Sequence, residues 1–553
     1  MKLIKVCFIL FYFILSNVFL FAQVVYEPLY KDIYGFLTRL STKGVIEYND
    51  EIRPLSRMYI AKKIIEAEKS PGSLTSVERE ELEFYKRDYY FEFRMMNKDD
   101  HSKNVNYVGD DPASRLRAFS YSDDLFKFNL SPILGYELGS IDKEKSTHLW
   151  NGVYTYGYIS DALGVSFDFR DNTETGKAID KFKKFTPVTG VNARSDDNII
   201  NYSADKIEYS EAKGVIATNW SWGTFAVGKE FFEWGYGESG LLVLSQKAPS
   251  FPFIRLDVNP ADWFGFNYIH AWLSSDVIDS SSFYYTSTDA IKFSYREKYI
   301  ASHSIFIRPL KGLKFSLGES IVYSDKLEIS YLIPVIFFRL ADHYLSRQKN
   351  AAGANAQIFM SVSSRNHLMN THLYATLFID ELTIAGLFDP PKERNQIGFN
   401  IGASVVDLPI DNLTLTAEYT KIYPFVYDHF IQTQTYQSAS YNLGNWVGDN
   451  SDQVYGSLKY RFIRGLEAEI WARYIRKGGQ GKAEDQYEQP QPPFLFGLRT
   501  KHTYFGVNIK YEFIHELFAR FRFQNMNTSA QQEDLSFIDK SVAEFNFAVY
   551  YGM

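Results

Sequence analysis

The chain has one cysteine, Cys7, among its 553 residues, and it has only one long apolar run, residues 6–21. A single thiol excludes an intramolecular disulfide, a CxxC redox motif and a zinc site built on several thiolates. After residue 21, no stretch approaches the roughly 18 apolar residues that a membrane-spanning helix needs. Basic charge is not in excess either, since 59 Lys and Arg stand against 66 Asp and Glu. Without a basic face, the chain is not expected to bind nucleic acid.

The apolar run near the N-terminus has the layout of a secretory signal peptide. Lys2 and Lys5 precede it, and Ala22 follows it. The sequence therefore predicts a signal peptide over residues 1–22 and export of the remaining chain. An uncleaved membrane anchor is the alternative, and the shortness of the run argues against it.

A five-residue pattern, Phe-Ile-x-(Glu or Gly)-Leu, occurs at residues 378–382, 462–466 and 513–517. Around the second copy, apolar residues such as Val454 and Leu458 alternate with polar residues such as Lys459 and Arg461. Period-2 alternation on both sides of the pattern predicts a β-hairpin with a very short turn at each copy.

These short turns alternate with long polar stretches, at residues 474–504 and 524–543. Outer-membrane barrels have this asymmetry, with short turns in the periplasm and long loops outside the cell. The last two copies of the pattern are 51 residues apart, which predicts an all-β transmembrane barrel of about 18 antiparallel strands over residues 89–553. Its 40 Tyr and 46 Phe suit the aromatic girdles of such a barrel.

A soluble sandwich or propeller is the alternative fold, and it would place apolar residues on its inner faces. This chain keeps charge on one face of its strands instead. The residues expected to line the lumen are Lys459, Arg461, Glu467, Glu469, Arg520 and Arg522. The last strand is expected to run to the C-terminus, with Phe545 and Phe547 facing lipid.

Residues 23–88 have a different pattern and are predicted to form a small N-terminal helical domain. Ile33, Phe36 and Leu40 recur at helical spacing, and residues 75–78 form a capping box that opens a later helix. From Tyr89 onward the pattern favours strands, with Phe91 and Phe93 in the first of them.

Residues 235–240 match the dinucleotide-binding pattern G-x-G-x-x-G, but the β-type run 241–244 follows in place of the required helix. The glycines are therefore expected to allow a bend or a close backbone approach at the barrel wall. His367 and His372, the closest of the scattered histidines, lack the spacing of a zinc helix. There is no GxSxG motif. We expect no cofactor, no metal and no enzymatic activity.

The predicted outer loops offer two candidate binding surfaces. Within residues 430–452, flat rings and an amide suit stacking on sugars and hydrogen bonding to them; they are Tyr436, Tyr441, Asn445 and Trp446. A second loop is locally basic and could attract an acidic glycan or lipopolysaccharide phosphates through Lys181, Lys183, Lys184 and Arg194. Ordinary solvated loop residues remain the alternative for both sets.

Several segments, taken in order, resemble the Wzi family of capsule-assembly outer-membrane proteins. They are residues 37–46, the Arg-Pro-Leu-Ser-Arg stretch 53–57, residues 228–245, residues 331–334 and residues 378–382. The resemblance implies a barrel whose helical N-terminal domain closes the periplasmic end, and a lectin-like role in holding capsular polysaccharide at the cell surface.

We therefore expect an outer-membrane monomer inserted by the barrel-assembly machinery, with polysaccharide, membrane lipid and lipopolysaccharide as its other partners. A porin-like or substrate-specific transporter is the main alternative function. An outer-membrane hydrolase is a further one.

Overall fold

The structure is a computed structural model that describes residues 22–97, 103–160, 162–179, 199–203, 205–349, 353–382, 395–488 and 490–552. The predicted signal peptide lies outside these residues except for Ala22. None of the helices in these ranges is both long and apolar enough to cross a membrane.

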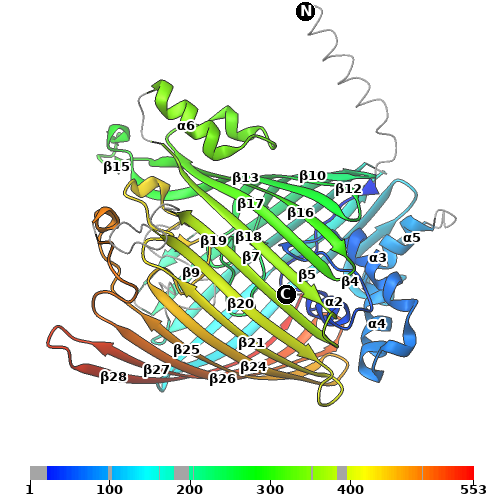
Figure 1. Cartoon of the computed structure of the whole chain (residues 1–553). Helices are drawn as coiled ribbons and strands as arrows, with labels where there is room; N and C mark the ends of the chain where they lie inside the picture. Colours follow the sequence, from blue (N-terminus) through cyan, green and yellow to red (C-terminus); the bar gives the residue numbers. More distant parts are fainter. Residues whose placement is uncertain are drawn as a thin grey trace, which may run out of the picture.

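Eighteen antiparallel strands in the described ranges form a closed barrel, as the hairpin repeat predicted (Figure 1). The ring closes where the last strand pairs with the first, from Glu544 opposite Ile141 to Tyr551 opposite Leu134. In chain order the strands are β5 (Phe126–Ile141), β6 (Glu144–Ile159), β7 (Leu163–Gly176), β9 (Lys206–Trp220), β10 (Gly223–Glu230), β12 (Phe251–Ala261), β13 (Phe264–Ile278), β16 (Tyr295–Leu310), β17 (Leu313–Ser324), β18 (Asn355–Arg365), β19 (Thr371–Glu381), β20 (Gln396–Val406), β21 (Leu413–Ile422), β24 (Ser451–Ile463), β25 (Leu466–Lys477), β26 (Thr500–Ile514), β27 (Leu517–Gln531) and β28 (Phe537–Tyr551).

Short strands extend this wall at its edges. The hairpin of β3 (Asn104–Asp110) and β4 (Leu116–Ser122) pairs with the first half of β5, and β28 pairs with the second half. β1 (Ala22–Gln23) and β8 (Ile199–Tyr202) both pair with β9.

The two ends of the barrel differ in their connections. At one end, two-residue turns join β16 to β17, β24 to β25 and β26 to β27. In these turns Gly312, Gly465 and Glu516 have positive φ angles of 74°, 76° and 61°, the left-handed conformation that tight hairpins need. Most of the long connections lie at the opposite end. We call these the turn end and the loop end; in barrels of this class the turn end faces the periplasm.

The copy of the repeat at residues 378–382 is not a tight turn, contrary to the prediction. β19 ends at Glu381, and β20 begins only at Gln396. Phe378 is fully buried and points into the barrel, whereas Phe462 is 53% exposed on the outer face. The same five-residue pattern therefore occurs at opposite ends of the barrel, with its Phe facing the lumen in one copy and facing outward in the other. The pattern determines neither the direction of the strand nor the face on which its side chains lie.

The predicted faces of the last strands are confirmed. Ile470, Ile509, Phe545 and Phe547 are exposed on the outer wall. The charged residues point inward and form ion pairs, such as Lys510 with Glu467 at 3.5 Å and Arg520 with Glu137 at 3.0 Å. The alternation thus separates a lipid-facing surface from a polar lumen.

Four helices precede the barrel: α2 (Ile33–Thr42), α3 (Arg57–Glu68), α4 (Ser76–Asp88) and α5 (Tyr90–Met96), with a short η1 (Pro71–Ser73). Thr75 and Glu78 form the predicted capping box at α4. Phe91 and Phe93 lie in α5 and not in a strand, because they pack with the helices: Phe91 is buried and Phe93 contacts their apolar cluster. Tertiary packing here overrides the strand preference of aromatic residues.

These helices sit at the turn end of the barrel (Figure 1), held there by ion pairs to the wall and its turns. The pairs include Lys43 with Asp407 at 2.8 Å, Lys31 with Glu516 at 2.6 Å and Arg365 with Asp50 at 2.8 Å. The N-terminal residues therefore occupy the mouth of the barrel at the turn end.

Candidate functional site: the filled lumen and the loop end

Two long connections at the loop end fold into the barrel. Residues 231–250 join β10 to β12, and residues 423–450 join β21 to β24. The first contains β11 (Glu233–Trp234), which pairs with β2 (Ile52–Arg53) from the N-terminal residues. The second contains η6 (Gln432–Gln434), β22 (Gln437–Ser438) and β23 (Tyr441–Asn442). The N-terminal residues and a loop-end connection therefore meet inside the lumen.

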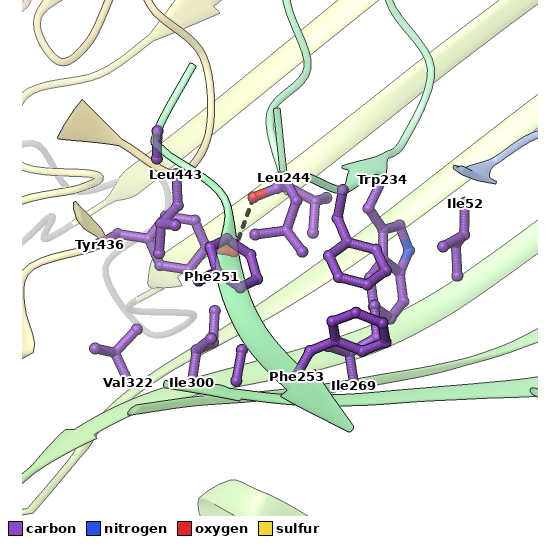
Figure 2. Packing of buried hydrophobic residues seen from close by; sticks show 14 of the residues in the cluster. Ile52, Trp234, Leu244, Phe251, Phe253, Ile269, Ile300, Val322, Tyr436 and Leu443 are labelled. Atoms are coloured by element: carbon purple, nitrogen blue, oxygen red, sulfur yellow. Dashed lines mark hydrogen bonds between the residues drawn. The ribbon is translucent and has the colours of Figure 1, made fainter. Parts of the chain in front are cut away.

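Both connections pack into one apolar core with the inner wall. The rings of Tyr427 and Tyr436 stack 5.7 Å apart, and their hydroxyls donate to the carbonyl oxygens of Leu242 at 3.0 Å and Val243 at 2.8 Å. Figure 2 shows this core, where residues of the connections lie against the wall; those labelled are Ile52, Trp234, Leu244, Phe251, Phe253, Ile269, Ile300, Val322, Tyr436 and Leu443. Packed apolar side chains thus occupy part of the lumen.

The glycine-rich stretch 235–240 belongs to this core. A Cβ atom on Gly237 would lie 2.5 Å from the carbonyl oxygen of Gly240, and Gly240 itself has a φ of +154°. Leu241 to Leu244 are buried and non-helical. The predicted close backbone approach is therefore present, but it lies inside the lumen and not at the wall.

The four residues predicted to contact sugar from residues 430–452 are buried in the same core. Trp446 is only 5% exposed, and Tyr436, Tyr441 and Asn445 are more deeply buried. The Trp446 indole N–H donates to the carbonyl oxygen of Ser239 at 2.6 Å, and the Arg473 guanidinium lies 5.3 Å from its ring. Their ring faces are covered by protein, which corrects the expectation of outward stacking surfaces. An 18-stranded barrel has a wide lumen, and these rings fill it.

The other predicted binding residues, Lys181, Lys183, Lys184 and Arg194, lie outside the described residues. Their role in binding acidic groups stays a prediction.

Two buried carboxyls sit in the connection 423–450. Asp449 accepts the backbone N–H of Tyr427 at 3.0 Å and 3.2 Å. Burial raises the pKa of Asp449 well above its usual value, and the neighbouring Asp428 raises it further. Burial also raises the pKa of Asp428, and Lys477 opposes that shift.

Across the described ranges, no group of three His, Cys, Asp or Glu side chains is placed to hold a metal ion.

Exposed aromatic rings occur instead on connections that reach outward. The connection from β13 to β16 contains a hairpin of β14 (Tyr284–Tyr285) and β15 (Ile291–Lys292) at the loop end (Figure 1). Tyr285 is 73% exposed, and Phe283 and Tyr284 are exposed beside it. Hydroxyl groups flank these rings at residues 280–282 and 286–288. We call this surface, residues 280–293, the aromatic hairpin.

A second exposed pair is formed by Phe430 and Tyr487, whose rings from two different connections lie 5.8 Å apart. Neither surface was identified from the sequence. The run Ser-Ser-Ser-Phe-Tyr-Tyr-Thr-Ser-Thr at residues 280–288 is the signal that marks the first, because it combines stacking rings with hydroxyls in a long connection.

Comparisons with known proteins agree with this architecture. The profile described as "Capsule assembly protein Wzi" matches residues 164–536. The chain is similar to the structure of Wzi from Escherichia coli, described as an outer membrane protein involved in group 1 capsule assembly and a carbohydrate-binding β-barrel. The two share 12% identity with a TM-score of 0.55, over 96% of this chain and 100% of that chain.

Weaker similarities are to Pseudomonas aeruginosa OccK7 and Acinetobacter baumannii OccAB4. Each has 11% identity and a TM-score of 0.41 over 77% of this chain, and the match covers 98% and 97% of the respective structures. No curated protein matches the chain. Because the family profile covers more than half of the sequence and the fold agrees with it, the chain belongs to the Wzi family of capsule-assembly proteins.

Proposed function

We propose that this outer-membrane β-barrel binds capsular or other extracellular polysaccharide at the cell surface and holds it there, as a non-catalytic lectin-like protein. Family membership supports this proposal, as does the likeness in fold to a barrel described as carbohydrate-binding. The observation that carries it is the aromatic hairpin, which presents Tyr284 and Tyr285 on the outer side of a barrel whose lumen is packed.

The chemistry of the aromatic hairpin suits a sugar polymer. Tyrosine rings offer flat faces to the C–H surface of a pyranose, and the serine and threonine hydroxyls next to them can exchange hydrogen bonds with sugar hydroxyls. Each exposed ring contact contributes about 1 kcal/mol, by analogy with other aromatic pairings. A polymer meets many copies of the protein, so weak contacts add up through avidity.

The packed lumen disfavours the transporter alternative. Diffusion through a barrel needs a continuous aqueous path, and the cluster containing Trp234, Tyr427 and Tyr436 fills part of the lumen. We propose that the surrounding lipid and lipopolysaccharide contact the outer wall, that the barrel-assembly machinery inserts the chain, and that it acts as a monomer. The basic loop with Lys181 and Arg194 is a second candidate contact for an acidic glycan.

The test is polysaccharide retention by cells that express a Tyr284→Ala/Tyr285→Ala variant. Both side chains are exposed, so the variant should insert and retain its heat-modifiable mobility in electrophoresis. We expect more polysaccharide in the medium and less on the cells, approaching the gene deletion. Leu535→Ala, at an exposed residue of another connection, is the matched control and should retain polysaccharide normally.

Two results would count against the proposal in different ways. If the deletion strain sheds no polysaccharide, the proposed function is wrong. If deletion sheds polysaccharide and the tyrosine variant does not, the function stands and the binding surface lies elsewhere, with the loop at residues 181–194 as the next target.

A further inference from the structure

The connection from β17 to β18 lies on the outside of the barrel wall. It contains η3 (Ile329–Leu332) and α6 (Phe338–Lys349), and Figure 1 shows α6 beyond the wall formed by β13 and β17. We call residues 325–349 the outer strap.

Strand alternation shows which wall surface the outer strap covers. In β17, Phe315 and Leu317 are exposed on the outer face. Because alternate residues share a face, Glu319, Ile321 and Tyr323 also point outward, and yet all three are buried. The outer strap therefore hides a patch of wall that would otherwise face lipid.

The contacts beneath the outer strap are close and specific. The ring of Phe338 lies 4.4 Å from that of His303 on β16, and the ring of Tyr331 lies 4.8 Å from that of Tyr323. The hydroxyl of Tyr268 on β13 donates to the carbonyl oxygen of Tyr331 at 2.8 Å. Phe338 and Tyr331 are both buried by these contacts.

The wall surface beneath the outer strap contains polar side chains, and the outer strap keeps them out of contact with lipid. Glu319 lies 3.3 Å from His303 and accepts the backbone N–H of Phe338. His270 is hydrogen-bonded to the Tyr323 hydroxyl at 2.7 Å. A carboxylate and two imidazoles on the outer wall would be costly in hydrocarbon, and the outer strap shields them while supplying a hydrogen bond to Glu319.

The opposite surface of the outer strap is apolar and uncovered. Val335 is 79% exposed, and Ile333, Phe337 and Leu340 are exposed beside it. A third side of α6 is cationic or polar, with Arg339, His343 and Arg347 exposed at a spacing of four residues. A helix with this division lies in the plane of a membrane interface, with its apolar side among the acyl chains.

The wall next to the outer strap continues this apolar surface. A concavity of about 630 Å³ opens on the outer face, lined by residues that include Ile305, Leu317, Met360, Leu377 and Ile401. Ile305 and Leu317 are each two residues from the covered pair, His303 and Glu319. The exposed side of the outer strap is thus continuous with the lipid-facing band of the barrel.

We propose that the outer strap is embedded in the outer leaflet and binds an anionic, acylated lipid there. The lipid's acyl chains lie against Val335, Leu340 and the adjoining concavity. Its phosphate groups meet the row of Arg339 and Arg347. The barrel thereby fixes lipid molecules on one side of its circumference, a contact separate from the aromatic hairpin.

The experiment uses single-cysteine variants of the whole chain, in a background where the chain's sole cysteine is replaced by Cys7→Ser. An environment-sensitive fluorophore is attached at Val335→Cys, and the protein is refolded into phosphatidylcholine vesicles with brominated acyl chains. Ile509→Cys marks the lipid-facing wall, and Tyr285→Cys marks the aqueous loop end. We expect bromolipid to quench the Val335 label at least half as strongly as the Ile509 label, and aqueous iodide to quench it several-fold less than the Tyr285 label.

The head-group contact has its own readout. Quenching at Val335 should be stronger when the brominated lipid is phosphatidylglycerol, mixed into unbrominated phosphatidylcholine, than when brominated phosphatidylcholine is mixed at the same fraction. Arg339→Gln/Arg347→Gln should remove that difference. Equal quenching by the two lipids in the parent chain would refute the anionic preference.

Two outcomes would overturn the proposal as a whole. Iodide quenching equal to that of Tyr285→Cys would place the outer strap in water. A label shielded from both quenchers, together with disulfide-linked dimers of the unlabelled Val335→Cys variant, would show that a second copy of the chain covers this surface in place of lipid.

Discussion

At the scale of single residues, Ile509 and Asn508 show how strongly the wall divides neighbouring side chains. Ile509 is exposed on the outer face of β26, while Asn508 points inward and donates to Glu469 at 2.9 Å. A shift of one residue along the strand therefore changes the environment of the side chain from lipid to the polar lumen. The role of Trp446 also depends on its surroundings: its ring is buried and packs inside the lumen, so it is not a contact surface on the outside of the protein.

An arginine at these two positions should have very different costs. Ile509→Arg should lower the free energy of unfolding by ~2 to 4 kcal/mol if the residue lies near the bilayer midplane, and Asn508→Arg should cost far less because Glu469 can pair with it. Denaturant titrations of protein refolded in vesicles measure both values. Similar losses at the two positions would contradict the assignment of faces.

At the scale of elements, the strands were predictable and the connections were not. Alternation alone placed Lys459 and Arg461 inward and Phe545 outward, because in a barrel each strand residue has only two possible environments. No such rule tells a connection whether to fold inward, so the burial of Tyr436 and Trp446 could not be read from their loop-like surroundings.

The same limit applies to the ends of elements. Phe378 was predicted to begin a turn because its five-residue pattern matched two true turns, but its strand runs toward the loop end. The N-terminal helices were visible from their period and from the capping box, whereas α5 was missed because its aromatic residues have a strand-like composition. The outer strap was also missed, since its position depends on the polar patch on β16 and β17 beneath it.

The turn between β26 and β27 binds the N-terminal residues electrostatically. Glu516 in that turn forms an ion pair with Lys31 at 2.6 Å, and the Nε2 atom of His515 lies 2.6 Å from an Asp88 carboxylate oxygen. Burial alone would raise the pKa of Glu516, but Lys31, His515 and Arg117 outweigh it and lower the pKa to about 2. A carboxyl whose pKa is depressed by folding adds stability above its unfolded pKa, and this stability is lost as the pH falls through the folded pKa.

Glu516→Gln should therefore destabilise the attachment at neutral pH and have little effect at about pH 2, with the difference shrinking below about pH 4.5. Removing one member of a buried pair leaves Lys31 uncompensated, so a loss on the order of 3 kcal/mol is expected at pH 7. Thermal unfolding at a series of pH values measures this. Glu533→Gln, at an exposed carboxyl of another connection, is the control. A pH-independent difference would rule out the ionic role.

At the scale of the whole molecule, two separate parts of the chain obstruct the barrel. The N-terminal helices occupy the turn end, and the two inward connections fill the middle. Removing the N-terminal residues takes away the pairing of β2 with β11. The inward connections should still stay in place, because the contacts of Tyr427 and Tyr436 with residues 242 and 243 do not involve the N-terminal residues.

Single-channel recordings in planar bilayers should show this directly. The intact chain should conduct very little, and deletion of residues 24–97 should raise conductance only partly. Additional replacement of residues 232–249 by a short Gly-Ser linker should open a pore of porin-like conductance. Porin-like currents through the intact chain would instead favour a transport function.

The Lys31–Glu516 ion pair joins residues 485 positions apart in the chain. The N-terminal residues, which are synthesised first, are therefore bound by the hairpin of β26 and β27, one of the last to be synthesised. Contacts of such long sequence separation form slowly, since most of the chain must be ordered before they can be made. The contact between the N-terminal helices and the turn from β26 to β27 is therefore expected to form late, after nearly all of the strands have been made. The first hundred residues can therefore reach their final position only when one of the last hairpins is in place, so the mouth at the turn end is completed at the end of barrel assembly.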